Sequence, residues 1–150
     1  MKKIVITGGC GFIGSHIVEY FFEKYKKSQI YVLDKITYAA NIKNLSKIKK
    51  YKRLKIFRKN ILDFKFLKKI TANSDLVIHA AAESHVDNSY RLNDDFVMTN
   101  VLGTKNVMQA CKENRVKKIL HISTDEIYGE IFRGSFKEND RFNPSNPYSS

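Results

Sequence analysis

The feature that most limits the possible folds of this chain is a glycine-rich turn between a strand and a helix. Residues 2–7, KKIVIT, form a short β-branched run, residues 7–14 read TGGCGFIG, and apolar residues then recur at helical spacing. Gly8 permits a tight turn, Gly11 lets the backbone approach a pyrophosphate, and Gly14 lets the helix pack closely on the strand. This arrangement predicts the first unit of a dinucleotide-binding fold.

The alternation of strand and helix continues along the sequence. Further strands are expected at 29–34, 54–57, 75–81 and 117–123, and helices near 42–51, 63–70 and 92–115. Such alternation implies parallel pairing through right-handed crossovers. The sequence therefore predicts an α/β protein with a doubly wound parallel sheet (Rossmann fold), formed as one domain by residues 1–150, with ligands at the carboxyl ends of the strands.

An acidic residue completes the dinucleotide-binding signature. Asp34 ends the second expected strand, about 20 residues after Gly14, where it can hydrogen-bond a ribose diol. Its charge would repel a 2′-phosphate, so we expect NAD rather than NADP, with Lys35 moderating the preference. A glycine-rich turn beside an unrelated surface aspartate is the simpler alternative, and the strand, turn and helix context argues against it.

The formal charge of +12 raises the question of an anionic partner. The basic residues are mostly lysines spread over 43–59, 65–69 and 117–118, which is typical of a solvated face. Small anionic ligands and nucleic acid are the alternatives, but no basic motif interleaved with aromatic residues supports nucleic-acid binding. We therefore expect no nucleic-acid partner. We also expect no membrane partner, since no apolar run of about eighteen residues occurs.

The sequence offers no metal site. Cys10 and Cys111 lie in different expected elements and form no zinc or disulfide spacing. His79 and His121 lie inside expected strands, which favours hydrogen-bonded core or edge imidazoles over metal ligands. The residues 121–129, HISTDEIYG, carry an adjacent acid pair after an apolar strand that we expect to be buried.

The motifs resemble those of the extended short-chain dehydrogenase/reductase family, and within it those of the dTDP-glucose 4,6-dehydratases. The matching stretches are TGGCGFIGSH from Thr7, VLDKITYAAN from Val32, IHAAAESHVDNS from Ile78, TNVLGT from Thr99, ISTDEIYG from Ile122 and PYSS from Pro147. The resemblance implies dehydration of dTDP-glucose to dTDP-4-keto-6-deoxyglucose with bound NAD. It also implies a homodimer that serves rhamnose-type deoxysugar synthesis. We expect a cytoplasmic protein, because the residues after Met1 form no signal-peptide pattern and no long apolar run occurs.

The resemblance further implies the roles of individual residues. Tyr148 would be the base at the sugar 4-hydroxyl, Glu126 would remove and return the C5 proton, and Asp125 would protonate the departing 6-hydroxyl. Thr124 would hydrogen-bond the sugar near C4, and Ser84 would contact the substrate. The expected cofactor-binding residues are Gly8, Gly11, Phe12, Ile13, Gly14, Asp34, Lys35, Thr37, Asn60, Ile61, Ala80, Ala81, Ala82, Thr99 and Tyr148.

The chain departs from the family pattern at three places. Asn60 stands where the family has aspartate, which keeps an acceptor but loses the charge, and Asn88 stands where arginine is common. The lysine of the YxxxK motif would fall at position 152, beyond Ser150. We therefore expect the amino-terminal part of a longer enzyme, without the last strands and the sugar-nucleotide domain, and inactive alone.

Alternatives remain open for the acid pair and for the function. From spacing alone, Asp125 and Glu126 could be helix-capping or solvated loop acids. The enzymatic alternatives are a UDP-sugar 4-epimerase and a UDP-glucose 4,6-dehydratase. A non-catalytic NAD-binding module is the alternative from another class.

Overall fold

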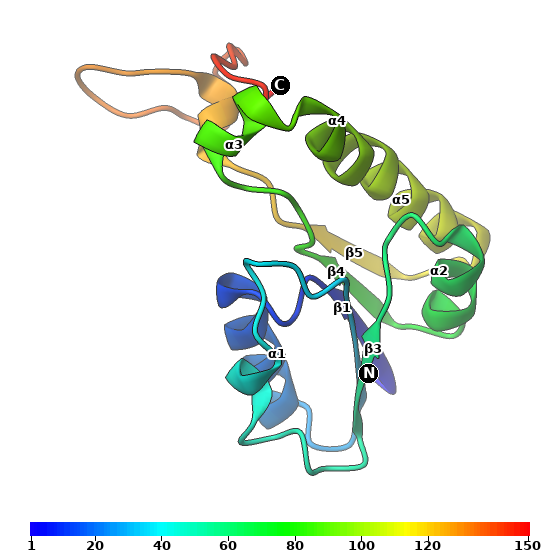
Figure 1. Ribbon diagram of the computed structural model, residues 1–150. Coiled ribbons are helices and arrows are strands. Elements are labelled where there is room, and N and C mark those ends of the chain that lie inside the picture. The colour runs from blue at the N-terminus through cyan, green and yellow to red at the C-terminus, as the bar shows by residue number, and fades with distance from the viewer.

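Five parallel strands form one sheet in the computed structural model, which describes residues 1–150 (Figure 1). Their order across the sheet is β3-β2-β1-β4-β5. The strands are β1 (Lys3–Thr7), β2 (Gln29–Asp34), β3 (Leu54–Arg58), β4 (Leu76–His79) and β5 (Lys118–His121). The chain winds outward from β1 in one direction to β3 and in the other to β5, so the topological switch point lies between β1 and β4. The expected doubly wound parallel sheet is confirmed.

Helices cover both faces of the sheet, with α1 on one side and α2 and α5 on the other (Figure 1). The helical elements are α1 (Phe12–Lys24), η1 (Ile42–Leu45), α2 (Phe64–Thr71), α3 (Val86–Arg91), α4 (Asn93–Phe96), η2 (Val97–Gly103), α5 (Thr104–Glu113) and η3 (Asp125–Tyr128). Two expectations need correction in detail. The helix expected over 42–51 is only the 3-10 turn η1, and the middle of the long expected helix, η2, is π-helical.

The core lies in two layers because side chains of a strand alternate between the two faces of a sheet. Ile4 and Ile6 of β1 pack toward α1, whereas Val5 packs toward α2 and α5, and all three are completely buried. Asp63 begins α2 as expected, since its Oδ1 accepts a hydrogen bond from the backbone of Phe66 at 3.0 Å. No helix of the molecule combines the length and apolarity needed to cross a membrane.

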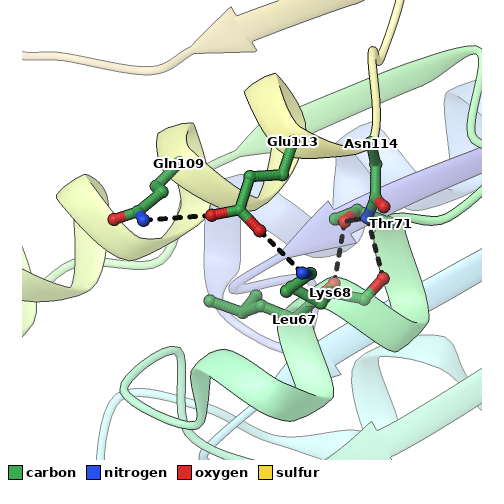
Figure 2. Close-up of polar contacts among 6 residues, drawn as sticks. All are labelled: Leu67, Lys68, Thr71, Gln109, Glu113 and Asn114. Atoms are coloured by element: carbon green, nitrogen blue, oxygen red, sulfur yellow. Dashed lines mark hydrogen bonds and ion pairs between the residues drawn. The ribbon is translucent and has the colours of Figure 1, made fainter.

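Asn114 fastens the end of α5 to the end of α2 (Figure 2). Its Nδ2 donates to the Lys68 carbonyl oxygen and to Thr71 Oγ1, both at 2.8 Å. Beside it, Lys68 Nζ lies 2.7 Å from Glu113 Oε2, and Gln109 Nε2 donates to Glu113 Oε1 at 3.0 Å. These contacts fix α5, which continues the helix carrying η2, against the same face of the sheet as α2.

The edge strand β5 differs from the rest of the sheet. It pairs only with β4, and all four of its residues are exposed. The apolar run of this strand predicts burial, and that prediction is wrong in this structure. A strand is buried only when neighbours cover its faces and edges, and the local sequence does not reveal those neighbours.

Candidate cofactor and active site

A cavity of about 450 Å³ lies at the carboxyl ends of β1, β2 and β4. All fifteen residues expected to bind cofactor line it, and so does Ser84. They come from six separate segments of the chain, so the fold brings together residues that are far apart in the sequence. His85, which the AESHVD motif also indicates as a lining residue without a catalytic role, lies in the cavity wall too. Seven further lining residues were not expected from the sequence, namely Leu33, Ala39, Ala40, Lys59, Glu83, Ile122 and Ser123. Each lies within a few positions of an expected residue, which was the available signal.

The glycine-rich loop after β1 is shaped for close backbone approach. Gly8 has a φ of +70°, and a side chain there would lie 2.6 Å from the Ala80 carbonyl oxygen. A Cβ on Gly14 would collide with the Gly8 carbonyl oxygen, whereas one on Gly11 would have no neighbour nearer than 3.4 Å. The following helix has no side-chain cap and no acid in its first turn, so its amides can receive an anion.

Asp34 joins the glycine-rich loop to the segment that follows β2. Its buried carboxylate accepts from the Cys10 amide at 2.9 Å and from the Ile36 amide at 2.7 Å. Ile36 has a φ of +57°, a rare conformation for a β-branched residue, so the carboxylate stabilises a strained turn. Burial, and next the Asp34 charge, raise the pKa of the Cys10 thiol to about 12, which keeps it protonated.

Asn60 follows β3 and lines the same cavity. Asn60 Oδ1 accepts a hydrogen bond from the Leu62 amide at 3.0 Å. The acceptor that asparagine preserves is therefore engaged by the backbone, and the side-chain nitrogen is the group left for a ligand. Lys35 and Lys59 line the cavity as well, together with the acids Asp34 and Glu83, and Lys59 Nζ lies 3.7 Å from Asp63 Oδ2.

Two segments that line the cavity touch each other through Tyr38. Asn88 Nδ2 donates to the Tyr38 hydroxyl at 3.2 Å, and the rings of Tyr38 and His85 lie 5.6 Å apart. Tyr38 stands between lining residues of the β2 loop, and His85 belongs to the lining segment after β4. Asn88, which replaces the arginine common in the family pattern, therefore connects the two walls.

His79 is a structural residue beneath the cavity, as expected. It is fully buried, with Nδ1 2.6 Å from Thr7 Oγ1 and Nε2 2.9 Å from Thr104 Oγ1. Burial, and to a smaller extent the neighbouring His121, lower the pKa of His79 to about 4. The neutral imidazole thus connects β1, β4 and α5. No group of three or more His, Cys, Asp or Glu side chains is arranged to hold a metal ion.

The expected catalytic residues are only partly brought together. Tyr148 lines the cavity and packs edge-on against Phe96 at 6.3 Å. Glu126 Oε2 accepts from Asn146 Nδ2 at 2.9 Å, which ties the acid to the turn that carries Tyr148. Asp125 is exposed and makes no side-chain contact to another polar group, and neither it nor Glu126 lines the cavity.

Thr124 organises the acid pair locally. Its Oγ1 accepts from the Glu126 amide at 3.2 Å and caps η3, so the two acids occupy the first turn of this short helix. The capping residue is thus Thr124 rather than either acid. Thr124 does not line the cavity, although Ile122 and Ser123 just before it do.

Comparison with known proteins decides the family. A family model described as GDP-mannose 4,6 dehydratase matches residues 5–150. The chain belongs to this family. Two relatives of the chain are dTDP-D-glucose 4,6-dehydratases. The protein of Dictyostelium discoideum is 42% identical over 163 residues, and that of Homo sapiens is 39% identical over 151 residues. The alignments cover 100% and 99% of this chain but only 38% and 43% of the relatives, so the chain spans less than half of their length.

Solved structures of the family agree with the fold. DesIV of Streptomyces venezuelae, a dTDP-glucose 4,6-dehydratase with NAD bound, matches with a TM-score of 0.94 and 37% identity over 98% of this chain and 47% of its own. A UDP-N-acetylglucosamine 4-epimerase of Methanobrevibacter ruminantium matches with a TM-score of 0.90 and 31% identity, over 99% and 46%. The chain is therefore homologous to the amino-terminal part of NAD-dependent sugar-nucleotide dehydratases and epimerases.

Proposed function

We propose that this chain is the cofactor-binding part of a cytoplasmic enzyme that dehydrates dTDP-glucose to dTDP-4-keto-6-deoxyglucose. The observation that carries the proposal is the convergence of all fifteen expected NAD contacts, Tyr148 among them, on one cavity. The product would serve deoxysugar nucleotide synthesis of the rhamnose type. The likeness to dTDP-glucose dehydratases supports the choice of nucleotide.

The residues of the cavity fit a dinucleotide. The Gly11 backbone and the uncapped amides of α1 suit a pyrophosphate, and Asp34, held by two backbone amides, suits an adenosine ribose. The small side chains at 80–82 leave room for a flat ring at the switch point. Bound NAD supplies a reversible two-electron acceptor for the sugar.

The chain's own side chains would handle the protons. Tyr148, which lines the cavity, would take the proton of the 4-hydroxyl. Glu126, held by Asn146, would remove and return the C5 proton, and Asp125 would give a proton to the departing 6-hydroxyl. The partly buried Glu126 and the exposed Asp125 have different environments, which suits one base and one acid in the same reaction.

A product assay with mass detection tests the proposal on the protein that carries this chain. We expect loss of one water from dTDP-glucose, no product from UDP-glucose, and NAD binding without turnover by residues 1–150 alone. Glu126→Gln should stop the reaction after oxidation, and Asp125→Asn should slow the loss of water. Glu130→Gln, at an exposed acid nearby, is the control. A 4-epimer from a UDP-sugar, or normal dehydration by Glu126→Gln, would contradict the proposal.

A homodimer is also proposed for the enzyme. Val97, Met98, Val101 and Leu102 on η2 are all more than a third exposed, which leaves an apolar stripe on the long helix. Light scattering should show association that depends on concentration. A monomer at tens of micromolar would contradict this part of the proposal.

A further inference from the structure

Glu83 lies in the wall of the cavity with its backbone clamped by one side chain. Its amide donates to Asn100 Oδ1 at 2.9 Å, and Asn100 Nδ2 donates to its carbonyl oxygen at 2.9 Å. Asn100 belongs to the π-helical segment η2, so the clamp joins the loop after β4 to the long helix. Two hydrogen bonds from one side chain fix the position from which the Glu83 carboxyl extends.

The Glu83 carboxyl itself has no partner in the protein. It makes neither a hydrogen bond nor an ion pair, although the residue is half-buried. Burial raises the pKa of this carboxyl, Lys35 and His85 partly oppose the shift, and Asp95 adds to it. No buried polar side-chain atom of the chain lacks a partner, so the Glu83 carboxyl oxygens still reach solvent and are free to accept a hydrogen bond from a ligand in the cavity.

The place of Glu83 in the sheet indicates which part of a ligand it would meet. Asp34 is the last residue of β2 and Glu83 follows β4, and these strands flank β1 on opposite sides. The two carboxyls therefore stand on opposite sides of the glycine-rich loop. A dinucleotide with its pyrophosphate at that loop would place one ribose near Asp34. Its second ribose, or the hexose of a bound sugar, would then lie near Glu83.

We propose that Glu83 is a ligand-binding residue that accepts hydrogen bonds from sugar hydroxyls, and that Asn100 is the positioning residue that holds it. The hydroxyls belong either to the second ribose of the dinucleotide or to the hexose. This inference rests on the proposed function, because it assumes that a dinucleotide and a sugar share the cavity. A carboxylate favours hydroxyl donors and repels phosphate, so Glu83 also keeps the pyrophosphate on the glycine-rich loop.

The first arm of the test measures NAD affinity of residues 1–150 by calorimetry. If Glu83 holds the ribose, Glu83→Ala weakens NAD binding about tenfold, and the isosteric Glu83→Gln weakens it less because it keeps one acceptor oxygen. Asp87→Asn, at an exposed acid just after this loop, is the matched control and should leave the affinity unchanged. Thermal unfolding of each variant checks that the fold is intact.

The second arm measures steady-state kinetics with dTDP-glucose on the protein that carries this chain. If Glu83 holds the hexose, NAD affinity is unchanged and KM for dTDP-glucose rises about tenfold in Glu83→Ala. Asn100→Ala should reproduce part of either effect and add nothing in the Glu83→Ala background, which a purely structural role would not show.

An effect in either arm supports the inference, and no effect of Glu83→Ala and Glu83→Gln in both arms overturns it. Failure of the proposed function is distinguishable, because it appears as lack of dTDP-glucose turnover by the unaltered protein. In that case the NAD-binding measurement still tests whether Glu83 binds the second ribose.

Discussion

Strands β4 and β5 pair residue for residue, yet their surroundings differ completely. β4 lies between β1 and β5, and all four of its residues are buried, whereas all four residues of β5 are exposed. Ile78 faces Leu120 in this register, and His79 faces His121. Similar side chains thus occupy the centre and the edge of one sheet.

The same contrast divides the candidate site. The cavity rests on the central strands, where Asp34, His79 and the glycines are fixed by buried contacts. The acid pair follows β5, and there the side chains of Thr124 and Asn146 bind Glu126, while Asp125 has no side-chain partner. We infer that packing sets the cofactor half of the site, whereas the acid half depends on local contacts of an open edge.

The largest expected effect compares Ile78 with Leu120, which occupy equivalent register positions. Ile78→Ala removes a completely buried side chain and should lower the free energy of unfolding by about 2–5 kcal/mol. Leu120 is 47% exposed, so Leu120→Ala should cost about 1 kcal/mol or less. Chemical denaturation measures both, and equal losses would contradict the contrast between centre and edge.

His79 predicts how acid affects the centre of the sheet. The folded protein lowers its pKa from 6.5 to about 4, so the unfolded chain binds the proton more readily. Stability should therefore fall as the pH drops from about 6.5 to about 4, by about 3 kcal/mol in total. Unfolding followed at several pH values should show less of this loss in His79→Asn. His121→Asn at the edge is the control and should retain most of it.

Asp34 tests the cofactor half of the site. Asp34→Ala removes a ribose acceptor and two backbone anchors, so NAD binding should weaken by about 1–3 kcal/mol. NADP binding should weaken less, because a negative charge near its 2′-phosphate disappears. Calorimetry with both cofactors measures the change. Asp125→Ala in the acid half should leave NAD affinity unaltered, and equal affinities of the unaltered chain for NAD and NADP would refute the assignment.

The smallest expected effect concerns the contact between the two cavity walls. Tyr38→Phe removes the acceptor for Asn88 at an exposed position, so NAD affinity should weaken by about 1 kcal/mol or less. Tyr20→Phe on α1, which removes another exposed hydroxyl with a side-chain partner, is the control. Tighter NAD binding by Tyr38→Phe would show that the contact obstructs the cavity.

The sequence predicts the central half better than the edge, for physical reasons. Strand periodicity, glycine spacing and the acid at Asp34 are local patterns, so they locate the sheet and the glycine-rich loop, whereas the other cofactor residues were expected from the family resemblance. The exposure of Leu120 and the clamp of Asn100 on Glu83 depend on neighbours outside the local pattern, and apolar spacing does not distinguish the π-helical η2 from an α-helix. Glu83 belongs to the AESHVD motif, but the sequence does not reveal that its carboxyl has no partner in the protein.

The lysines beside the cavity have a consequence for the speed of ligand capture. Lys35 and Lys59 line the cavity of a chain with a formal charge of +12, and a dinucleotide approaches through its negative pyrophosphate. Such a field accelerates diffusional encounter, and salt screens it over about 8 Å at physiological ionic strength. The association rate of the cofactor should therefore fall as salt rises, while the residence time changes little. The positive charge is too diffuse to predict a nucleic-acid partner, but it would still raise the rate at which small anions encounter the protein.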